Sequence, residues 1–143
     1  MLLVRPSYRD HWDIPGGYVE PGESPRAACG REIQEELGLT IDLGAMLVVD
    51  WAPAEQEGDK LLFIFDGGSL TVEQEQAIYF GDGELTNWRY VKPDDLESYG
   101  PARLARRVLT AITARNDNVG AYAEHGLQPT SNRRHGVDLA FTR

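Results

Sequence analysis

The chain has 143 residues and a formal net charge of −9, with 23 acidic and 14 basic residues. Its hydrophobic content of 41% and charged content of 26% are ordinary for a globular protein, and its length suits one domain over residues 1–143. The acidic balance argues against a nucleic-acid polymer or an anionic membrane surface as a partner. The apolar runs are too short to cross a membrane, and the single cysteine, Cys29, excludes an intrachain disulfide. We therefore expect a cytoplasmic protein.

The hydrophobic pattern predicts an alternation of strands and helices along the chain. In chain order, the predicted elements are strands at 2–5 and 17–19, a helix at Pro25–Leu37, a strand hairpin at 43–51 and 60–66, a strand at 87–91, a short helix that begins at Pro93, a helix at 101–115 and a strand at 137–141. Residues 74–84 are left unassigned, and residues 116–134 are polar and expected to be irregular. The extension 116–143 is expected to belong to the same domain.

The helix at Pro25–Leu37 has clear end signals. Ser24 suits the N-cap, Pro25 the first helical position, and Gly38 the left-handed position past the helix end. We expect one face to be core-facing and the other to carry charge. The core-facing residues are Gly30, Ile33 and Leu37, and the opposite face holds Ala28, Glu32, Glu35 and Glu36.

Three carboxylates of this helix share one face. Glu32, Glu35 and Glu36 have the spacing i, i+3, i+4, which stacks their side chains. Like charges so placed repel one another and oppose helix formation. A hard divalent cation would bind such oxygen ligands together with substrate phosphates. The alternative is a solvated acidic face, since Glu is a good helix former.

The stretch from Gly17 to Leu39 resembles the Nudix box. That box is a Gly, five residues, a Glu, seven residues, then Arg-Glu-apolar-x-Glu-Glu-x-Gly-apolar, and this chain reads GYVEPGESPRAACGREIQEELGL. Every fixed position matches, and the preceding WDIPGG resembles the usual lead-in. A chance match is of order 10⁻¹⁰ per starting position. The resemblance implies an α/β fold, a Nudix-like α/β/α sandwich with a mixed β-sheet.

The resemblance also implies a function. It implies hydrolysis of the diphosphate (P–O–P) bond in a small nucleoside diphosphate linked to another moiety, X. In that case Glu32, Glu35 and Glu36 would bind Mg²⁺ or Mn²⁺, with the Gly17 carbonyl as a further ligand. Arg31 would orient the carboxylates, and we expect it to pair with Glu23 and hold the loop against the helix.

Candidates outside the box rest on weaker signals. Glu84, in a glycine-rich loop, is the candidate for a further acidic ligand or general base, with Asp82, Glu73 and Glu75 as rivals. Arg5 and Arg9 are candidates for phosphate binding, against the alternative of solvated arginines. Three aromatic residues are either base-stacking or core residues. They are Trp12, Tyr18 and Trp51.

Two other functions and one structural question stay open. A Nudix domain that serves as a ligand-sensing module typically loses box carboxylates, and this chain keeps all of them. Isomerase chemistry on a prenyl diphosphate expects a catalytic Cys outside the box, whereas Cys29 lies inside it. Nudix domains usually begin with a strand before the equivalent of residues 2–5. We expect residues 137–141 to take that position, in the same chain or in the partner of a homodimer.

Overall fold

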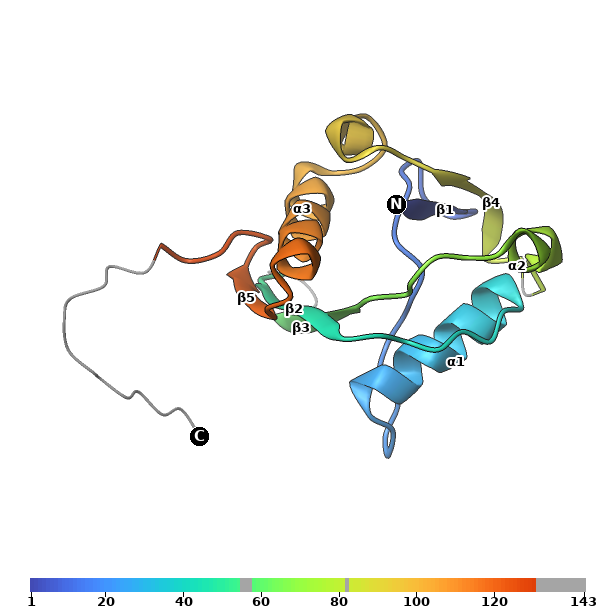
Figure 1. Cartoon of the computed structure of the whole chain (residues 1–143), viewed down its shortest axis with the longest axis horizontal. Helices are drawn as coiled ribbons and strands as arrows, with labels where there is room; N and C mark the ends of the chain where they lie inside the picture. Colours follow the sequence, from blue (N-terminus) through green and yellow to red (C-terminus); the bar gives the residue numbers. More distant parts are fainter. Residues whose placement is uncertain (55–57, 82, 131–143) are drawn as a thin grey trace.

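The computed structural model describes residues 1–54, 58–81 and 83–130. Strands and helices alternate, as the hydrophobic pattern predicts, and Figure 1 shows their arrangement. The elements are β1 (Leu2–Pro6), α1 (Pro25–Leu37), β2 (Met46–Ala52), β3 (Lys60–Phe65), α2 (Val72–Ala77), β4 (Leu85–Tyr90), the 3₁₀ helix η1 (Pro93–Ser98), α3 (Ala102–Asp117) and β5 (Ala121–Glu124).

The described strands form two sheets. β1 pairs with β4 in antiparallel register, with Val4 opposite Trp88. The second sheet has the order β3-β2-β5, and it is mixed because β2 is antiparallel to β3 and parallel to β5. The predicted hairpin and the predicted mixed sheet are both confirmed.

Helices cover both faces of the mixed sheet. Side chains alternate between the two faces of a strand, so Ile64 and Phe65 point in opposite directions. Ile64 packs with Val48 against the alanines of α3. On the opposite face, the guanidinium of Arg26 in α1 lies 5.1 Å from the centre of the Phe65 ring. The α/β/α arrangement is therefore confirmed.

Three predicted segments differ from the structure. No strand forms at 17–19: the Tyr18 carbonyl accepts from Arg31, and the flanking N–H groups of Gly16 and Glu20 donate to glutamate side chains. Residues 121–124, expected to be irregular, form β5. Their backbone pairs with the interior strand β2, and Ala121 and Ala123 fit under α3 because they are small. The unassigned segment contains most of α2, and the predicted strand at 137–141 lies outside the described residues.

A buried ion pair ties β2 to α3. Asp50 is 0% exposed, and its carboxylate accepts from Arg107 Nε at 2.6 Å and from the Gly126 N–H at 2.8 Å. Both oxygens are thus used, which is the condition under which a buried charge is tolerated. The pair also anchors the turn that follows β5.

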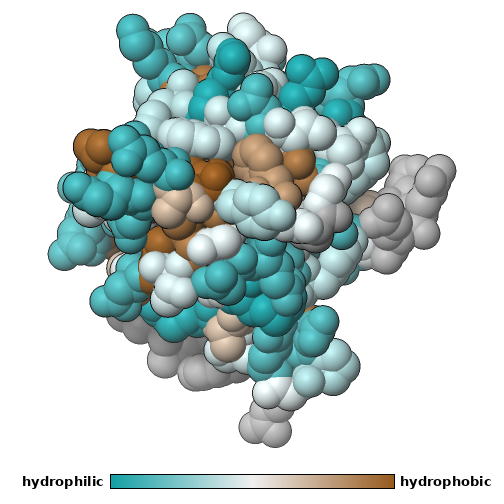
Figure 2. All heavy atoms as spheres, turned by 90° about the vertical axis from the view of Figure 1, so that its right-hand side faces the viewer, coloured by the Kyte–Doolittle hydropathy of each residue, from teal (hydrophilic) through white to brown (hydrophobic). Residues whose placement is uncertain are grey.

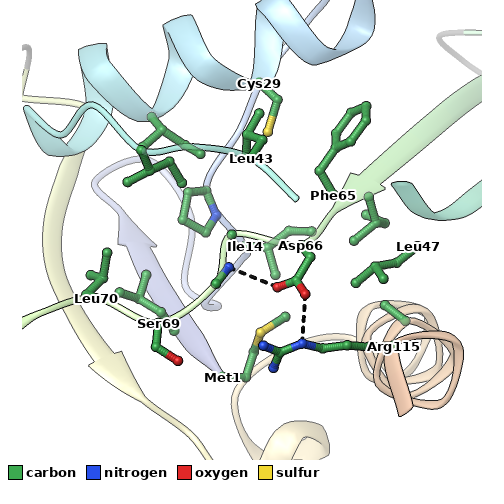
Figure 3. A pocket seen from close by; sticks show the side chains of 18 of the residues that line it. Met1, Ile14, Cys29, Leu43, Leu47, Phe65, Asp66, Ser69, Leu70 and Arg115 are labelled. Carbon is green, nitrogen blue, oxygen red and sulfur yellow. Dashed lines mark hydrogen bonds and ion pairs between the residues drawn. The ribbon is translucent and has the colours of Figure 1, made fainter. Parts of the chain in front are cut away.

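A cavity of about 650 Å³ lies between the two sheets. It is lined mainly by apolar side chains, among them Cys29, Ile33 and Leu37 of α1, with the Asp66–Arg115 ion pair at one side (Figure 3). On the face seen in Figure 2, apolar side chains gather at the centre and hydrophilic ones surround them. No box glutamate of α1 is among the residues that line the cavity. This cavity and the carboxylates therefore lie on different sides of α1.

None of the helices in the described part of the chain has both the length and the apolar character needed to cross a membrane.

Candidate active site

Helix α1 has the predicted bounds and the predicted caps. The Ser24 hydroxyl accepts the Ala27 N–H at 3.2 Å, and Pro25 occupies the first turn. Gly38 has a φ of 68°, and its N–H bonds the Gln34 carbonyl at 3.0 Å. A glycine suits this left-handed position because it has no Cβ. The local sequence thus sets the start and the end of the helix that carries the carboxylates.

Arg31 is the centre of the site. Its guanidinium contacts Glu23 (Nη2–Oε1, 2.8 Å), Glu32 (Nη1–Oε1, 3.0 Å) and Glu35 (Nη1–Oε2, 2.8 Å). Nη2 also donates to the Tyr18 carbonyl at 3.0 Å. The predicted Arg31–Glu23 pair is present, and it joins the loop before α1 to the helix itself.

These contacts shift two pKa values. The hydrogen bond from Arg31, together with one from the Glu20 N–H, holds the pKa of Glu23 below its ordinary value of 4.5. The same carboxylates, Glu23 first, raise the pKa of Arg31. Both groups stay charged at neutral pH, so the ion pair persists under physiological conditions.

The two glycines before the box bring the backbone close to the helix. Gly16 has a φ of 136°, which favours glycine, and its N–H donates to Glu36 Oε2 at 2.9 Å. At Gly17, an added Cβ would collide with the carboxylate carbon and with the oxygens of Glu32. The absence of a side chain at residue 17 therefore makes room for the Glu32 carboxylate.

The predicted division of α1 into two faces is partly wrong. Ile33 and Leu37 are buried as expected, but Ala28 and Glu36 are also buried, at 2% and 8% exposed. The backbone at Gly16 lies against Glu36 and donates a hydrogen bond to it. This carboxylate is therefore buried, although it was predicted to lie on the charged face of α1. Gly30, predicted to face the core, is not closely packed, because an added Cβ there would meet nothing within 4 Å.

The carboxylates suit a hard cation by their chemistry. Glu23, Glu32 and Glu35 contact the guanidinium of Arg31, and Glu36 of the same helix accepts from Gly16, so the four carboxylates and one guanidinium have a net formal charge of −3. Within the described residues, no three His, Cys, Asp or Glu side chains are arranged as a ready metal site. The reason is visible in the contacts: Arg31 engages Glu32 and Glu35, and the Gly16 turn engages Glu36. The donor set fits a divalent cation, and the close approach of the Gly17 backbone to the Glu32 carboxylate supports this fit.

The other predicted site residues lie near the β1–β4 sheet. Glu84 is exposed at the start of β4, where its carbonyl accepts the Ser7 N–H at 2.7 Å. Arg5 is exposed on β1, close to the same end of this sheet. Arg9 pairs with Asp13 at 3.3 Å. None of these contacts joins the three residues to the carboxylates of α1.

The alternatives to Glu84 and the aromatic candidates for base stacking differ in their surroundings. Glu75 accepts the Tyr90 hydroxyl at 2.6 Å, which raises the pKa of Tyr90 to about 12. Glu73 lies in the first turn of α2, and Asp82 lies outside the described residues. Trp12 is a core residue, 8% exposed and packed edge-on against Tyr99.

Tyr18 and Trp51 are exposed, at 70% and 37%. Lys60, which the sequence reasoning did not single out, donates from Nζ to the Tyr18 hydroxyl at 2.8 Å. Its position could have indicated this contact, because Lys60 is the first residue of the second hairpin strand and a side chain there can extend beyond the sheet.

Cys29 provides a test of the local environment, since it is the only cysteine. Burial, more than the nearby carboxylates, raises the pKa of its thiol above the ordinary 9.0. The thiolate is the reactive form, so iodoacetamide should label Cys29 more slowly in the native protein than in urea near pH 8. The difference should shrink as the pH rises toward the raised pKa. Mass spectrometry of timed samples measures both rates, and equal rates at pH 8 would contradict the prediction.

Known proteins are similar to this chain in sequence. A family model, NUDIX domain, matches residues 1–111. A Bacillus subtilis (strain 168) protein named "Putative 8-oxo-dGTP diphosphatase" is 39% identical over 97 residues, covering 67% of this chain and 60% of that protein. Diphosphoinositol polyphosphate phosphohydrolase 3-alpha of Mus musculus is 34% identical over 82 residues, covering 57% of this chain and 50% of that protein. The chain thus spans only half to three fifths of the length of these relatives.

Solved structures agree on the fold. A MutT protein from Methanosarcina mazei Go1 superposes with a TM-score of 0.64 at 24% identity, over 82% of this chain and 83% of that one. A UDP-X diphosphatase gives a TM-score of 0.64 at 22% identity, over 85% of this chain and 59% of that one. At these identities the likeness shows the shared α/β fold and nothing more specific.

Proposed function

Because this chain belongs to the NUDIX family, whose model matches residues 1–111, we propose that it is a metal-dependent diphosphohydrolase. It acts on the P–O–P bond of a small nucleoside diphosphate linked to another moiety, X, and residues 1–143 form one domain. Two of its relatives are named as a diphosphatase and a phosphohydrolase. The observation that carries the proposal is the set of carboxylates at α1: Glu23, Glu32 and Glu35 contact Arg31, the Glu32 carboxylate lies against Gly17, and the Gly16 N–H holds Glu36.

Each residue of the cluster has a distinct proposed role. Glu32, Glu35 and Glu36, with the Gly17 carbonyl, would hold Mg²⁺ or Mn²⁺. Such an ion, when bound, neutralises phosphate oxygens and makes water a better nucleophile. Arg31 positions Glu32 and Glu35 through its two short hydrogen bonds. The Gly16 N–H fixes Glu36 from the other side, so the carboxylates approach the diphosphate from a rigid helix.

Residues outside the box complete the proposal. Glu84 is the proposed later-loop carboxylate, as ligand or general base, and it must come within about 3 Å of the attacking water to act as a base. Arg5 and Arg9 are the proposed phosphate contacts, and Arg5 is favoured because Arg9 already pairs with Asp13. The partner is a small nucleotide rather than a nucleic-acid polymer, as the net charge of −9 suggests. A cytoplasmic location and a homodimer belong to the same proposal.

A substrate panel tests the reaction class. The purified chain is incubated with nucleoside triphosphates, nucleoside diphosphate sugars and dinucleoside polyphosphates, with Mg²⁺, with Mn²⁺ or with EDTA. We expect metal-dependent release of a nucleotide or phosphate product from at least one compound. No metal-dependent cleavage of any panel compound would contradict the proposal.

Replacing Gly17 by Ala tests the space beside Glu32. The added Cβ forces the flexible Glu32 carboxylate to move, and a displacement of about 1 Å in a catalytic site costs roughly 10²-fold in rate. Stability should change little, because the carboxylate is the far end of the flexible Glu32 side chain and can give way. Steady-state kinetics and a thermal melt measure the two effects. Gly58→Ala is not a suitable control because Gly58 has a φ of 80°, so Gly30→Ala, where nothing lies within 4 Å, is the matched variant.

A further inference from the structure

The cavity between the two sheets lies at the edge of a strand. In the described part of the chain, β3 is the outer strand of the order β3-β2-β5 and has only β2 as a strand partner. Residues 63–65 of β3 line the cavity, so side chains from both faces of this strand reach it. Residues 1–2 line it from the other sheet, but Val4 of that sheet already exchanges two backbone hydrogen bonds with Asp13. A further strand can therefore join the protein beside β3.

The two sides of the cavity differ in character. Cys29 and Ile33 of α1 line one side, and Ala111 and Arg115 of α3 line the other. Figure 3 shows Cys29 and Arg115 on different sides of this space. Arg115 uses Nε for Asp66, and a guanidinium carries four further N–H groups. A strand beside β3 would thus need an apolar face toward α1 and a small or acidic face toward α3.

One segment of this chain has these two faces. Residues 137–141 read VDLAF and lie outside the described residues. In an extended conformation, successive side chains point to opposite faces. One face would then carry Val137, Leu139 and Phe141, and the other Asp138 and Ala140. The first face matches the apolar side chains of α1, and the second offers a small residue and a carboxylate to α3.

We infer that residues 137–141 dock in this cavity, as a strand beside β3 of the same chain. The last residue that bonds to the sheet in the described part of the chain is Leu127, which exchanges hydrogen bonds with Glu124 of β5. The position beyond β3 is three strands away from β5, which is about 14 Å. The ten residues that lead from Leu127 to Val137 span up to about 33 Å, so the segment can reach the cavity.

The same chain is a better source of this strand than a second copy. A segment on a short flexible connection has an effective concentration of order millimolar, which exceeds the micromolar concentration of a dilute protein. Docking would also pair the free edge of β3, and an unpaired edge favours aggregation. Asp138 would add a second carboxylate to Arg115, on the side opposite the apolar contacts with α1.

Disulfide formation with Cys29 tests the docking, because Cys29 is the only cysteine and lines the cavity. Each residue of 137–141 is replaced by Cys in turn in the full chain, and the variants are oxidised at micromolar concentration. A disulfide requires Cα atoms within about 7 Å, so at least one of Val137→Cys, Leu139→Cys and Phe141→Cys should react about tenfold faster than the controls. The matched controls are Asp138→Cys and Ala140→Cys, whose side chains would face α3.

Intact mass and a non-reducing gel separate the products. An internal disulfide gives a monomer that has lost two thiols. Equal rates at all five positions would overturn the inference. A covalent dimer as the main product would also overturn it, because the segment would then dock in a second copy.

Alkylation of Cys29 adds a measurement that needs no new cysteine. Leu139→Asp should speed its labelling by iodoacetamide about tenfold, since the burial of one leucine changes a docking equilibrium by at least that factor. Asn132→Asp is the matched control, because it adds the same charge outside residues 137–141, and circular dichroism checks the fold of both variants. Equal labelling rates in the two variants would contradict the docking. Neither test uses turnover, so failure of the proposed function would leave this inference unaffected.

Discussion

Replacing Glu36 by Gln should lower the rate of diphosphate hydrolysis by several orders of magnitude and leave the fold intact. Glu36 is the buried carboxylate of the cluster, 8% exposed, and its Oε2 accepts the Gly16 N–H at 2.9 Å. Glutamine has nearly the same shape, and its amide oxygen can accept the same hydrogen bond. What it removes is the negative charge that would hold the divalent cation. Metal ions contribute several kcal/mol to stabilising such a transition state, and each 1.4 kcal/mol is about tenfold in rate.

The measurement is kcat/KM on a panel compound with Mg²⁺, accompanied by circular dichroism and a thermal melt. Glu97→Gln is the matched control, since Glu97 is an exposed carboxylate in η1 and the substitution changes the same charge. Turnover by Glu36→Gln that equals turnover by Glu97→Gln would remove the box helix from the mechanism. Retained nucleotide binding by a wild type without turnover would instead favour the ligand-sensing alternative.

Replacing Arg107 by Met should be the most destabilising of the single changes considered. The side chain of Arg107 is 9% exposed, and Arg107 Nε lies 2.6 Å from Asp50, which is fully buried. Methionine fills similar space but leaves a buried carboxylate without its cation. Breaking a buried ion pair in this way costs about 3–5 kcal/mol. Urea denaturation followed by fluorescence gives the free energy of unfolding.

The same helix supplies the control. Arg115 pairs with Asp66 through Nε at 2.8 Å, but its side chain is 53% exposed. Arg115→Met should therefore cost less than about 1 kcal/mol. The double variant Asp50→Asn with Arg107→Met should be more stable than Arg107→Met alone, since Asn is neutral and its oxygen still accepts from Gly126. Equal losses for Arg107→Met and Arg115→Met would show that burial does not decide the energy of this pair.

Local signals predicted α1 with its bounds because they act over a few residues. An N-cap serine bonds within the first turn, proline has the φ of the first helical position, and glycine adopts the left-handed end. The hairpin followed in the same way, since two apolar runs with a short polar connection pair with each other. These parts of the fold depend on residues that are close in sequence, so they can be predicted from one sequence alone.

Other segments were predicted wrongly because their conformation depends on contacts with residues far away in the sequence. The loop at 17–19 has a β-like sequence, yet it forms no strand: its Tyr18 carbonyl accepts from Arg31, and the N–H groups on either side of it donate to glutamates of other segments. Residues 121–124 have no strong strand signal, yet they pair with β2. In both cases the partner that decides the conformation lies elsewhere in the chain. Propensity is a weak guide where tertiary contacts compete with it.

The sequence alone determined the family resemblance, the helix Pro25–Leu37 and the clustering of Glu32, Glu35 and Glu36, because helical periodicity is a property of the local chain. It also predicted that Arg31 pairs with Glu23, and the structure contains that pair. Only the tertiary structure decided that Glu36 is buried beneath the Gly16 turn and that Lys60 reaches Tyr18. The reason is that burial and long-range contacts depend on where distant segments pack, whereas the spacing of residues within a helix does not.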